Sequence, residues 1–152
     1  MSFKYYWEDF QVGKRLNLGS TLVTKEDIVL FARSFDPQSF HIDESKGRDS
    51  VFGGLIASGW HTCSLVMRLM CDSYLLQSAS LGSPGMDNIK WVLPVRPNDT
   101  ISAFQTTTDK KASKSKPDRG AVKSFYEVMN HRDQLVMTME GVGFFRCRST
   151  EK

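Results

Sequence analysis

One long apolar helix limits what this chain can fold into more than any other feature. Residues 56–78 repeat apolar side chains at three- and four-residue steps, which is typical of a helix with one buried face. The stripe consists of Trp60, Cys63, Met67, Met70 and Tyr74, with Val66, Leu69 and Leu75 beside it. At ~1.5 Å per residue such a helix extends roughly 30 Å, the width of a small domain. Because it also carries His61, Arg68 and Asp72, the pattern indicates a core helix and not a membrane span.

Strand patterns follow this helix after a turn at residues 82–85. We expect strands over residues 89–95, 100–108, 121–130 and 134–146, the last two joined as a hairpin through residues 131–133. The basic segment over residues 109–120 is predicted to be an exposed loop. Helices gathered before a run of strands indicate the α+β class, and one long helix beside one sheet suggests that the sheet wraps around the helix.

Shorter elements precede the long helix. A first strand is predicted over residues 15–23, and Thr24 resembles an N-cap with Asp27 at the third helical position. The helix that follows places Ile28, Phe31, Ala32 and Phe35 on one face. It ends at Asp36, because Pro37 disfavours a helical backbone at the preceding residue. Asp43 is a candidate cap for a short helix over residues 44–49, and residues 51–55 form a glycine loop.

Length and composition indicate an ordinary globular protein. The 152 residues suffice for one domain over residues 1–152, and a net charge of +3 is too small to indicate nucleic acid as a partner. The three cysteines, Cys63, Cys71 and Cys147, form no paired framework, which favours reduced thiols. The N-terminus lacks the apolar core of a signal peptide. No stretch reaches about 18 uninterrupted apolar residues, the length that would predict a membrane span. We therefore expect a cytoplasmic protein with no membrane partner.

An acid and an imidazole lie five residues apart in the turn-rich segment before the long helix. Asp36 lies at a predicted helix end, and His41 follows the turn at residues 37–40. Unperturbed Asp and His titrate near ~3.9 and ~6.5, so together they can share proton transfers near neutral pH. Taken separately, each residue has a simpler interpretation, with Asp36 as a turn residue and His41 as a half-buried loop histidine.

A third candidate catalytic group lies at residues 53–59, where glycines mark the entry into the long helix. A helix N-terminus that opens on glycine is a ready site for a developing negative charge. An acid, a base and an oxyanion site are thus predicted within residues 36–59.

The stretch FARSFDPQSFHID, followed by FGGLIASGW, resembles the MaoC-like dehydratases, also called (R)-specific enoyl-CoA hydratases. The resemblance runs through nearly the whole chain and includes WVLPVRPNDTI. It implies a hotdog fold, in which a curled antiparallel sheet wraps a central helix, and a homodimer or a dimer of dimers. It also implies that Asp36 and His41 are the catalytic pair that binds and activates water. Gly59 matches the glycine whose backbone N–H holds the thioester oxygen.

The motif around the pair departs from the family pattern at three positions. Phe35 stands where the family has glycine, Gln38 where it has asparagine, and Ser39 where it has proline. Gln38 can keep the hydrogen-bonding role of the amide with a longer reach, so we count it among the substrate-binding candidates. None of the three changes removes an acid or a base, and they bear on substrate class more than on reaction type.

The function implied is reversible syn addition of water to the 2,3-double bond of an enoyl-CoA thioester. Asp36 and His41 would share two proton transfers, with the acid and base roles unassigned. Ser58 is predicted either to orient the pocket or to cap the helix. The reaction requires no metal or redox cofactor, since coenzyme A is part of the substrate.

Cations that could meet the coenzyme A phosphates are harder to choose. The basic loop offers Lys110, Lys111, Lys114, Lys116 and Arg119, and Arg96 is a further candidate, although a solvated surface loop is the simpler interpretation.

Two rival functions stay open, a hotdog acyl-CoA thioesterase and a non-catalytic acyl-CoA-binding subunit. The first is disfavoured because Asp72, the acid of the long helix, lies far from its glycine entry. The second is disfavoured because both members of the pair are present.

Overall fold

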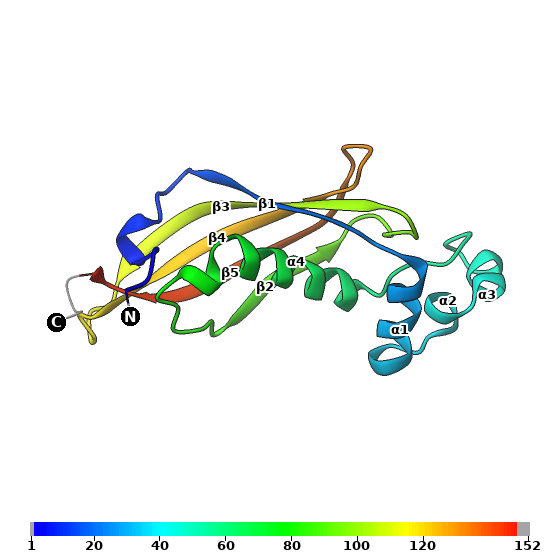
Figure 1. Cartoon of the computed structure of the whole chain (residues 1–152), viewed down its shortest axis with the longest axis horizontal. Coiled ribbons are helices and arrows are strands. Elements are labelled where there is room, and N and C mark those ends of the chain that lie inside the picture. Colours follow the sequence, from blue (N-terminus) through cyan, green and yellow to red (C-terminus); the bar gives the residue numbers. More distant parts are fainter. Residues whose placement is uncertain (1, 149–152) are drawn as a thin grey trace.

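A computed structural model describes residues 2–148 of the chain as one antiparallel sheet with a long helix on its concave face (Figure 1). The strands are β1 (Arg15–Leu22), β2 (Gly85–Trp91), β3 (Thr100–Ala112), β4 (Arg119–Met129) and β5 (Leu135–Arg146). The helices are α1 (Lys25–Phe35), α2 (Ser39–Ile42), α3 (Glu44–Asp49) and α4 (Gly59–Ser73), with short 3-10 turns η1 (Trp7–Asp9) and η2 (Leu75–Gln77). The five strands follow the order β1-β3-β4-β5-β2, and each neighbouring pair is antiparallel.

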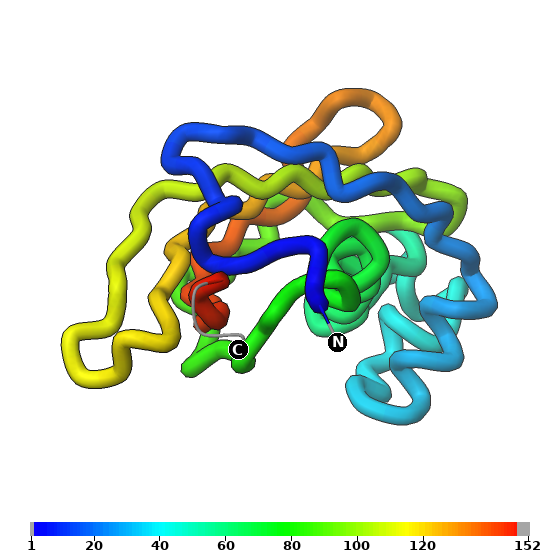
Figure 2. Tube along the Cα trace, turned by 60° about the vertical axis from the view of Figure 1, so that its left-hand side comes forward, coloured from blue at the N-terminus to red at the C-terminus, as the bar shows by residue number. Residues whose placement is uncertain are grey.

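The core lies between α4 and the curved sheet. Val66, Leu69 and Met70 are buried on the helix side, and Ile101 and Met137 are buried on the sheet side. Figure 2 shows the strands arching over α4. Burial of apolar side chains from both layers supplies the main driving force for this arrangement. The α+β class and the hotdog arrangement predicted from the sequence are confirmed.

The predicted bounds of the long helix are wrong at both ends. The Ile56 N–H donates to the Phe40 carbonyl at 3.2 Å and the Ala57 N–H to the Val95 carbonyl at 2.8 Å, so this stretch pairs with other segments and α4 begins only at Gly59. At the other end Tyr74 has a φ of −150°, outside the helical region, and α4 ends at Ser73. The helix is therefore about 22 Å long and not 30 Å.

The apolar stripe of this helix is also rotated relative to the prediction. Trp60 is 56% exposed and Met67 is 46% exposed, whereas His61 and Thr62 are buried with Val66. This exposed edge faces β2 at the end of the sheet, since the Trp60 ring contacts the Trp91 ring at 5.3 Å between centroids and Met67 lines a cavity with Met86. The hydrophobic pattern does not distinguish the apolar residues of the buried face from those of this exposed edge, so the predicted stripe contains both.

The strands differ from the prediction in their ends. The sequence predicts a strand over residues 89–95, whereas β2 begins at Gly85 and ends at Trp91, so residues 92–95 lie outside it. β3 continues to Ala112 and β4 starts at Arg119, so the predicted basic loop shrinks to residues 113–118. Lys110 and Lys111 pair with Val122 and Ala121, which places both lysines in a strand.

The elements before α4 largely follow the prediction. The Thr24 hydroxyl accepts from the Asp27 N–H at 3.1 Å, and α1 ends at Phe35 with Asp36 as its C-cap. Asp43 caps α3 by accepting from the Lys46 N–H at 3.0 Å. The stretch after Pro37 forms the short helix α2 instead of a simple turn. Phe35 was expected on the buried face of α1 and is instead 75% exposed.

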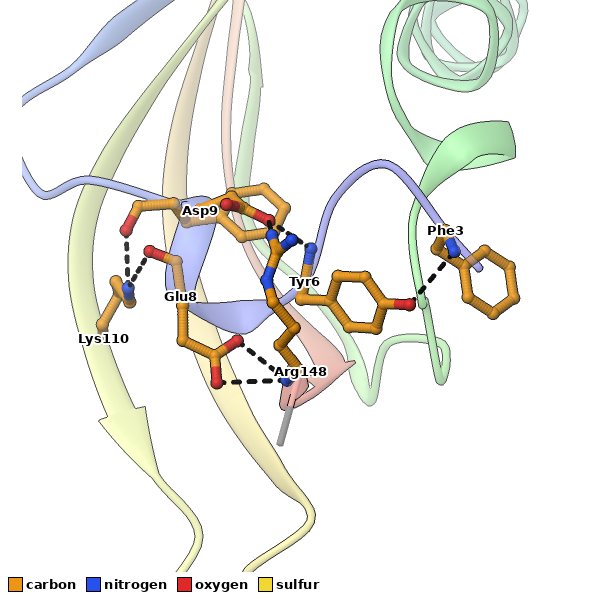
Figure 3. A network of polar contacts seen from close by, with 7 residues as sticks. Phe3, Tyr6, Glu8, Asp9, Lys110 and Arg148 are labelled. Carbon is orange, nitrogen blue, oxygen red and sulfur yellow. Dashed lines mark hydrogen bonds and ion pairs between the residues drawn. The ribbon is translucent and has the colours of Figure 1, made fainter. Parts of the chain in front are cut away.

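The two ends of the described chain meet at the end of the sheet opposite α1, α2 and α3 (Figure 1). The Arg148 N–H donates to both carboxylate oxygens of Glu8 at 3.1 Å, and the Arg148 guanidinium binds the Asp9 carboxylate (Figure 3). The Lys110 ammonium donates to the carbonyls of Glu8 at 3.3 Å and Phe10 at 2.6 Å. Its nitrogen also lies 4.4 Å from the centre of the Trp7 ring. Between Phe3 and Arg148 no helix is long and apolar enough to cross a membrane.

Candidate active site

Asp36 and His41 are brought together by two short helices with a tight connection. The Asp36 N–H donates to the Ala32 carbonyl at 2.8 Å, which closes the last turn of α1 and fixes Asp36 as its cap. The Gln38 N–H then donates to the Asp36 carbonyl and the His41 N–H to the Gln38 carbonyl, at 2.8 and 2.9 Å. These backbone bonds fold the chain back, and the His41 Nε2 lies 3.2 Å from the Asp36 Oδ2.

The other nitrogen of the His41 ring has a fixed partner. The His41 Nδ1 lies 2.7 Å from the Ile56 carbonyl oxygen. Because a carbonyl oxygen only accepts hydrogen bonds, Nδ1 carries a proton and the Nε2 is the nitrogen left for chemistry. The His41 side chain is 5% exposed and the Asp36 side chain 18% exposed, so the pair is largely shielded from bulk water.

Two further side chains hold the Asp36 carboxylate. The Ser58 hydroxyl donates to Oδ2 at 2.6 Å, and the Gln38 amide donates to Oδ1 at 2.8 Å. Burial alone raises the pKa of Asp36, but these two hydrogen bonds and the nearby His41 ring outweigh it. The pKa of the Asp36 carboxyl therefore lies below its ordinary value.

The 3.2 Å contact between the His41 ring and the Asp36 carboxylate constrains how many protons the two groups hold together. With a proton already on Nδ1, an unprotonated Nε2 facing an ionised Asp36 would set two acceptors against each other. One proton between Nε2 and Oδ2 removes that repulsion, whichever atom carries it. The geometry thus favours a pair that holds one exchangeable proton between Nε2 and Oδ2.

Gly59 lies beside this pair at the first position of α4. The Gly59 N–H has no acceptor within the helix, since the first N–H groups of any helix lack an intrahelical partner. Ser58 precedes it as the N-cap but makes no side-chain capping bond, because its hydroxyl is committed to Asp36. An N–H at the positive end of the helix can bind a developing negative charge.

The indole of Trp91 covers the other side of Gly59. The Trp91 Nε1 donates to the Gly59 carbonyl at 3.1 Å. A Cβ on residue 59 would lie 2.3 Å from a Trp91 ring carbon, so only glycine permits this approach. Trp91 contributes a wall of the site that sequence reasoning missed, although a large aromatic residue within the strand predicted over residues 89–95 gave a signal.

These groups line a cavity of about 420 Å³. Asp36, Gln38, His41 and Gly59 contribute its polar groups, and its apolar wall includes Phe40, Phe52, Trp60, Trp91, Leu93 and Val95. A pocket with apolar walls and few converging polar groups is typical of a small-molecule site. Sequence reasoning also missed the Ile56 carbonyl, because a backbone acceptor leaves no mark in residue identity.

The predicted phosphate-binding cations lie at different distances from the cavity. The Arg96 guanidinium donates to the Phe52 carbonyl at 2.5 Å, so this cation lies directly behind a wall of the cavity. Thr100, at the start of β3, pairs with Leu22 just before α1, and Lys110 lies ten residues further along β3. At ~3.3 Å per residue that is about 33 Å. The structure does not bring Lys110 or Lys111 to the cavity of its own chain.

His61, on the first turn of α4, does not line the cavity. Its ring stacks on Phe31 of α1 with centroids 4.8 Å apart, and its buried Nδ1 has no hydrogen-bond partner. Burial lowers the pKa of His61, and the Asp27 carboxylate opposes this shift in part. Among residues 2–148 no group of three or more His, Cys, Asp or Glu side chains is arranged to hold a metal ion.

Comparisons with known proteins agree on one family. Residues 9–142 match the family described as MaoC like domain. The Bacillus subtilis (strain 168) protein named "Uncharacterized protein YdeM" is 30% identical over 108 residues, which are 71% of this chain and 77% of that protein. The crystal structure of the MaoC-like dehydratase from Rhodospirillum rubrum aligns with a TM-score of 0.86 and 38% identity, covering 94% of this chain and 98% of that one.

A more distant solved structure shares the fold. The (R)-hydratase from A. caviae, described as involved in PHA biosynthesis, aligns with a TM-score of 0.72 over 90% of this chain and 97% of its own. Its identity to this chain is 22%, a level at which the likeness concerns the fold.

Proposed function

Because the chain belongs to the MaoC-like domain family, we propose that it is a hydratase/dehydratase acting on a thioester. The reaction proposed is the reversible addition of water to the 2,3-double bond of an enoyl-CoA, which gives a 3-hydroxyacyl-CoA. The observation that carries the proposal is the 3.2 Å contact of the His41 Nε2 with the Asp36 Oδ2, in one cavity with Gly59. The shared fold with an (R)-hydratase is consistent with it.

The pair supplies both proton transfers of the reaction. In the hydration direction it gives its one stored proton to C2 and takes one proton from the attacking water, whose oxygen bonds to C3. The pair ends with one proton, so the cycle needs no further acid or base. Both transfers start from the side of the cavity that the pair occupies, so water adds in the syn sense.

Gly59 supplies the electrostatic stabilisation. As water adds to C3, negative charge develops on the thioester oxygen, and the Gly59 N–H at the start of α4 would donate a hydrogen bond to that oxygen. Such a donor contributes roughly 3–4 kcal/mol of transition-state stabilisation. The proposed chemistry uses protein groups alone, with no metal or redox cofactor.

Two supporting roles follow from the contacts at the pair. Ser58 and Gln38 keep the Asp36 carboxylate ionised and aimed at Nε2, so we assign both as positioning residues. Arg96 is the proposed contact for the coenzyme A phosphates, because it lies directly behind the cavity wall at Phe52, whereas Lys110 and Lys111 lie far along β3.

We also propose a homodimer formed through the β2 side of the sheet. Trp60, Trp91, Val92 and Leu93 are exposed side by side near this edge strand, with exposed fractions between 39% and 56%. An apolar surface next to an unpaired strand edge is the usual mark of an interface. A second chain there would cover one wall of the cavity.

The test is the loss of thioester-enone absorbance with crotonyl-CoA and longer enoyl-CoAs. Asp36→Asn and His41→Ala are each expected to lower kcat by about 100-fold or more, in line with general acid–base catalysis. Asp72→Asn and His131→Ala are matched controls, since both side chains are exposed and outside the cavity, and should retain activity.

Free thiol is measured in parallel to separate the rival functions. Thiol release without hydrated product would replace the proposal with a hotdog thioesterase. Saturable acyl-CoA binding without any turnover across the panel would replace it with an acyl-CoA-binding subunit.

A further inference from the structure

Trp91, the last residue of β2, lies against the first residue of α4. Its Nε1 donates to the Gly59 carbonyl at 3.1 Å. Three atoms of the indole, Cε2, Cδ2 and Nε1, lie between 2.3 and 2.6 Å from the point that a Cβ on residue 59 would occupy. The indole therefore holds Gly59 in two ways, through a hydrogen bond to its carbonyl and through close packing on the face where other residues carry a side chain.

The strand end that carries this indole is fixed to the sheet. Trp91 pairs with Met137 of β5, and the Val92 N–H donates to the Val136 carbonyl at 2.8 Å. On the helix side the Trp91 ring meets the Trp60 ring edge-on, with centroids 5.3 Å apart. Trp91 thus connects a fixed point of the sheet to the first two residues of α4.

The first turn of α4 lacks the usual side-chain cap. A cap residue normally accepts a hydrogen bond from the second or third N–H of the helix, which orients the first turn. Ser58 occupies the cap position, but its hydroxyl donates to Asp36 and it makes no capping bond. A restraint on this turn comes instead from the carbonyl side, where Trp91 binds Gly59.

Such a restraint has more effect on glycine than on other residues. Without a Cβ, glycine rotates about its backbone bonds more freely than other residues do. A small rotation at residue 59 redirects its N–H, and a misplacement of about 1 Å at a reacting group costs on the order of 100-fold in rate. An N–H that stabilises a transition state has to be oriented before the charge develops, because its benefit depends on avoiding reorganisation.

We infer that Trp91 is a positioning residue for the oxyanion donor, and that its indole orients the Gly59 N–H toward the thioester oxygen. This rests on the proposed function, in which that N–H meets the developing charge. Trp91 acts through Gly59 and exchanges no proton itself. Its contribution is made in the transition state, so it concerns kcat and not the affinity for substrate.

Trp7 provides a comparison within the same chain. Its Nε1 donates to the Ala121 carbonyl, also at 3.1 Å, and its ring lies 2.4 to 2.6 Å from the point that a Cβ on Gly120 would occupy. Both indoles thus cover a glycine and bind a backbone carbonyl. Trp7 lies beside Lys110, at the far end of β3 from the cavity, and does not line that cavity.

Trp91→Phe tests the inference because it keeps an aromatic ring and removes the Nε1 donor. With the enoyl-CoA that the wild type hydrates fastest, kcat is expected to fall about tenfold while KM stays within about twofold, the pattern of an interaction made only in the transition state. Trp7→Phe removes an equivalent bond far from the cavity and is the matched control, with kcat and KM both expected within about twofold of wild type. An unchanged kcat, with or without a change in KM, would leave Trp91 as a wall of the cavity and overturn the inference.

Folding and assembly are measured on the same samples. Trp91 also lies on the proposed dimer surface, so light scattering should show the same oligomeric state for Trp91→Phe and wild type, and a dissociated variant would assign the loss to assembly and overturn the inference. If Trp91→Phe does not fold, Trp91→Leu takes its place, with a larger expected loss of kcat because the donor and the flat ring are both gone. A loss in Trp7→Phe as large as in Trp91→Phe would assign the effect to stability and also overturn it.

The infrared carbonyl band of a saturated thioester separates this inference from the proposed reaction. Butanoyl-CoA labelled with carbon-13 at the thioester carbonyl has no double bond to hydrate, and a hydrogen bond from the Gly59 N–H lowers the stretching frequency of that carbonyl. Bound to wild type or Trp7→Phe, the band should lie below its position in solution, and in Trp91→Phe it should return toward the solution value. If enoyl-CoAs are not hydrated but this pattern holds, the reaction is wrong and the positioning role stands. If hydration occurs and the band is the same in Trp91→Phe and wild type, the positioning role is wrong.

Discussion

The His41 ring faces the Asp36 carboxylate through Nε2 because its other nitrogen donates to the Ile56 carbonyl at 2.7 Å. That carbonyl belongs to the segment just before α4, so the segment that delivers Gly59 also sets the tautomer of His41. Base, acid and oxyanion donor are therefore oriented by one stretch of backbone. Shifting Ile56 would disturb all three together.

Ser58→Ala should change the acid side of the pH profile. The Ser58 hydroxyl lowers the pKa of Asp36 through its 2.6 Å bond, and losing that donor raises the pKa. The acidic limb of kcat/KM should then move to higher pH, and kcat should fall about tenfold as the carboxylate loses its alignment. A pH–rate series measures both. Ser64→Ala, which removes an exposed serine of α4, is the control, and an acidic limb that stays in place would count against Ser58 as a positioning residue.

Gly59→Ala should displace Trp91. The added methyl group would overlap the indole, and overpacking of this kind typically costs about 1–3 kcal/mol of unfolding free energy. Chemical denaturation measures the loss, and the double variant Gly59→Ala/Trp91→Leu should recover most of it. The activity of the double variant, compared with that of Trp91→Leu alone, then shows whether the space beside the glycine is needed by the substrate or only by Trp91. Activity that stays low indicates that substrate needs the space, and activity that returns indicates that the glycine serves Trp91 alone.

His61→Phe should flatten the dependence of stability on pH. Burial keeps the pKa of His61 below its ordinary value, so the unfolded chain takes up a proton near pH ~6.5 while the folded chain does not. The unfolding free energy of the wild type should therefore fall as the pH drops below about 6.5. Phenylalanine keeps the stacking on Phe31 and removes the titrating group. Urea denaturation between about pH 8 and pH 5 measures the slope.

The control for that experiment is His131→Ala, an exposed histidine whose side chain is 47% accessible. It should leave the slope close to that of the wild type. The prediction fails if His61→Phe and wild type lose the same free energy over this range. The low pKa of Asp36 does not interfere, since its contribution is lost only as the pH falls below about 3.9.

Lys110→Met should reduce stability without weakening the binding of acyl-CoA. The ammonium holds two carbonyls of the N-terminal segment and lies over the Trp7 ring, contacts worth about 1–2 kcal/mol together. The residue lies at the far end of β3 from the cavity, so KM should not change. Lys111→Met, whose side chain is 80% exposed, should change neither quantity. A rise in KM for either variant would restore the lysines as phosphate ligands, reached from a second chain.

Local signals predicted the part of the site that is local. Pro37 ends α1 at Asp36, and Thr24 and Asp43 mark the helix starts, because capping and proline effects act within a few residues. Signals of this kind sufficed to expect Asp36 and His41 near each other.

Contacts made across the fold could not be predicted in this way. The start of α4 at Gly59 depends on Ala57 pairing with Val95, and the length of β3 depends on Lys110 and Lys111 pairing with β4. The polar composition of residues 109–112 favoured a loop, but the strand beside it supplied the hydrogen bonds that composition does not show. The closeness of Trp91 to Gly59 has the same origin.

The acid, the base and the groups that orient them all lie between residues 36 and 59, whereas Trp91, Leu93 and Val95 of the apolar cavity wall come from the chain beyond α4. Proton transfer and part of the apolar lining are thus carried by different stretches of sequence. A lineage can therefore change the substrate it prefers through substitutions in that wall, such as at Leu93 or Val95, while the reaction itself is inherited unchanged.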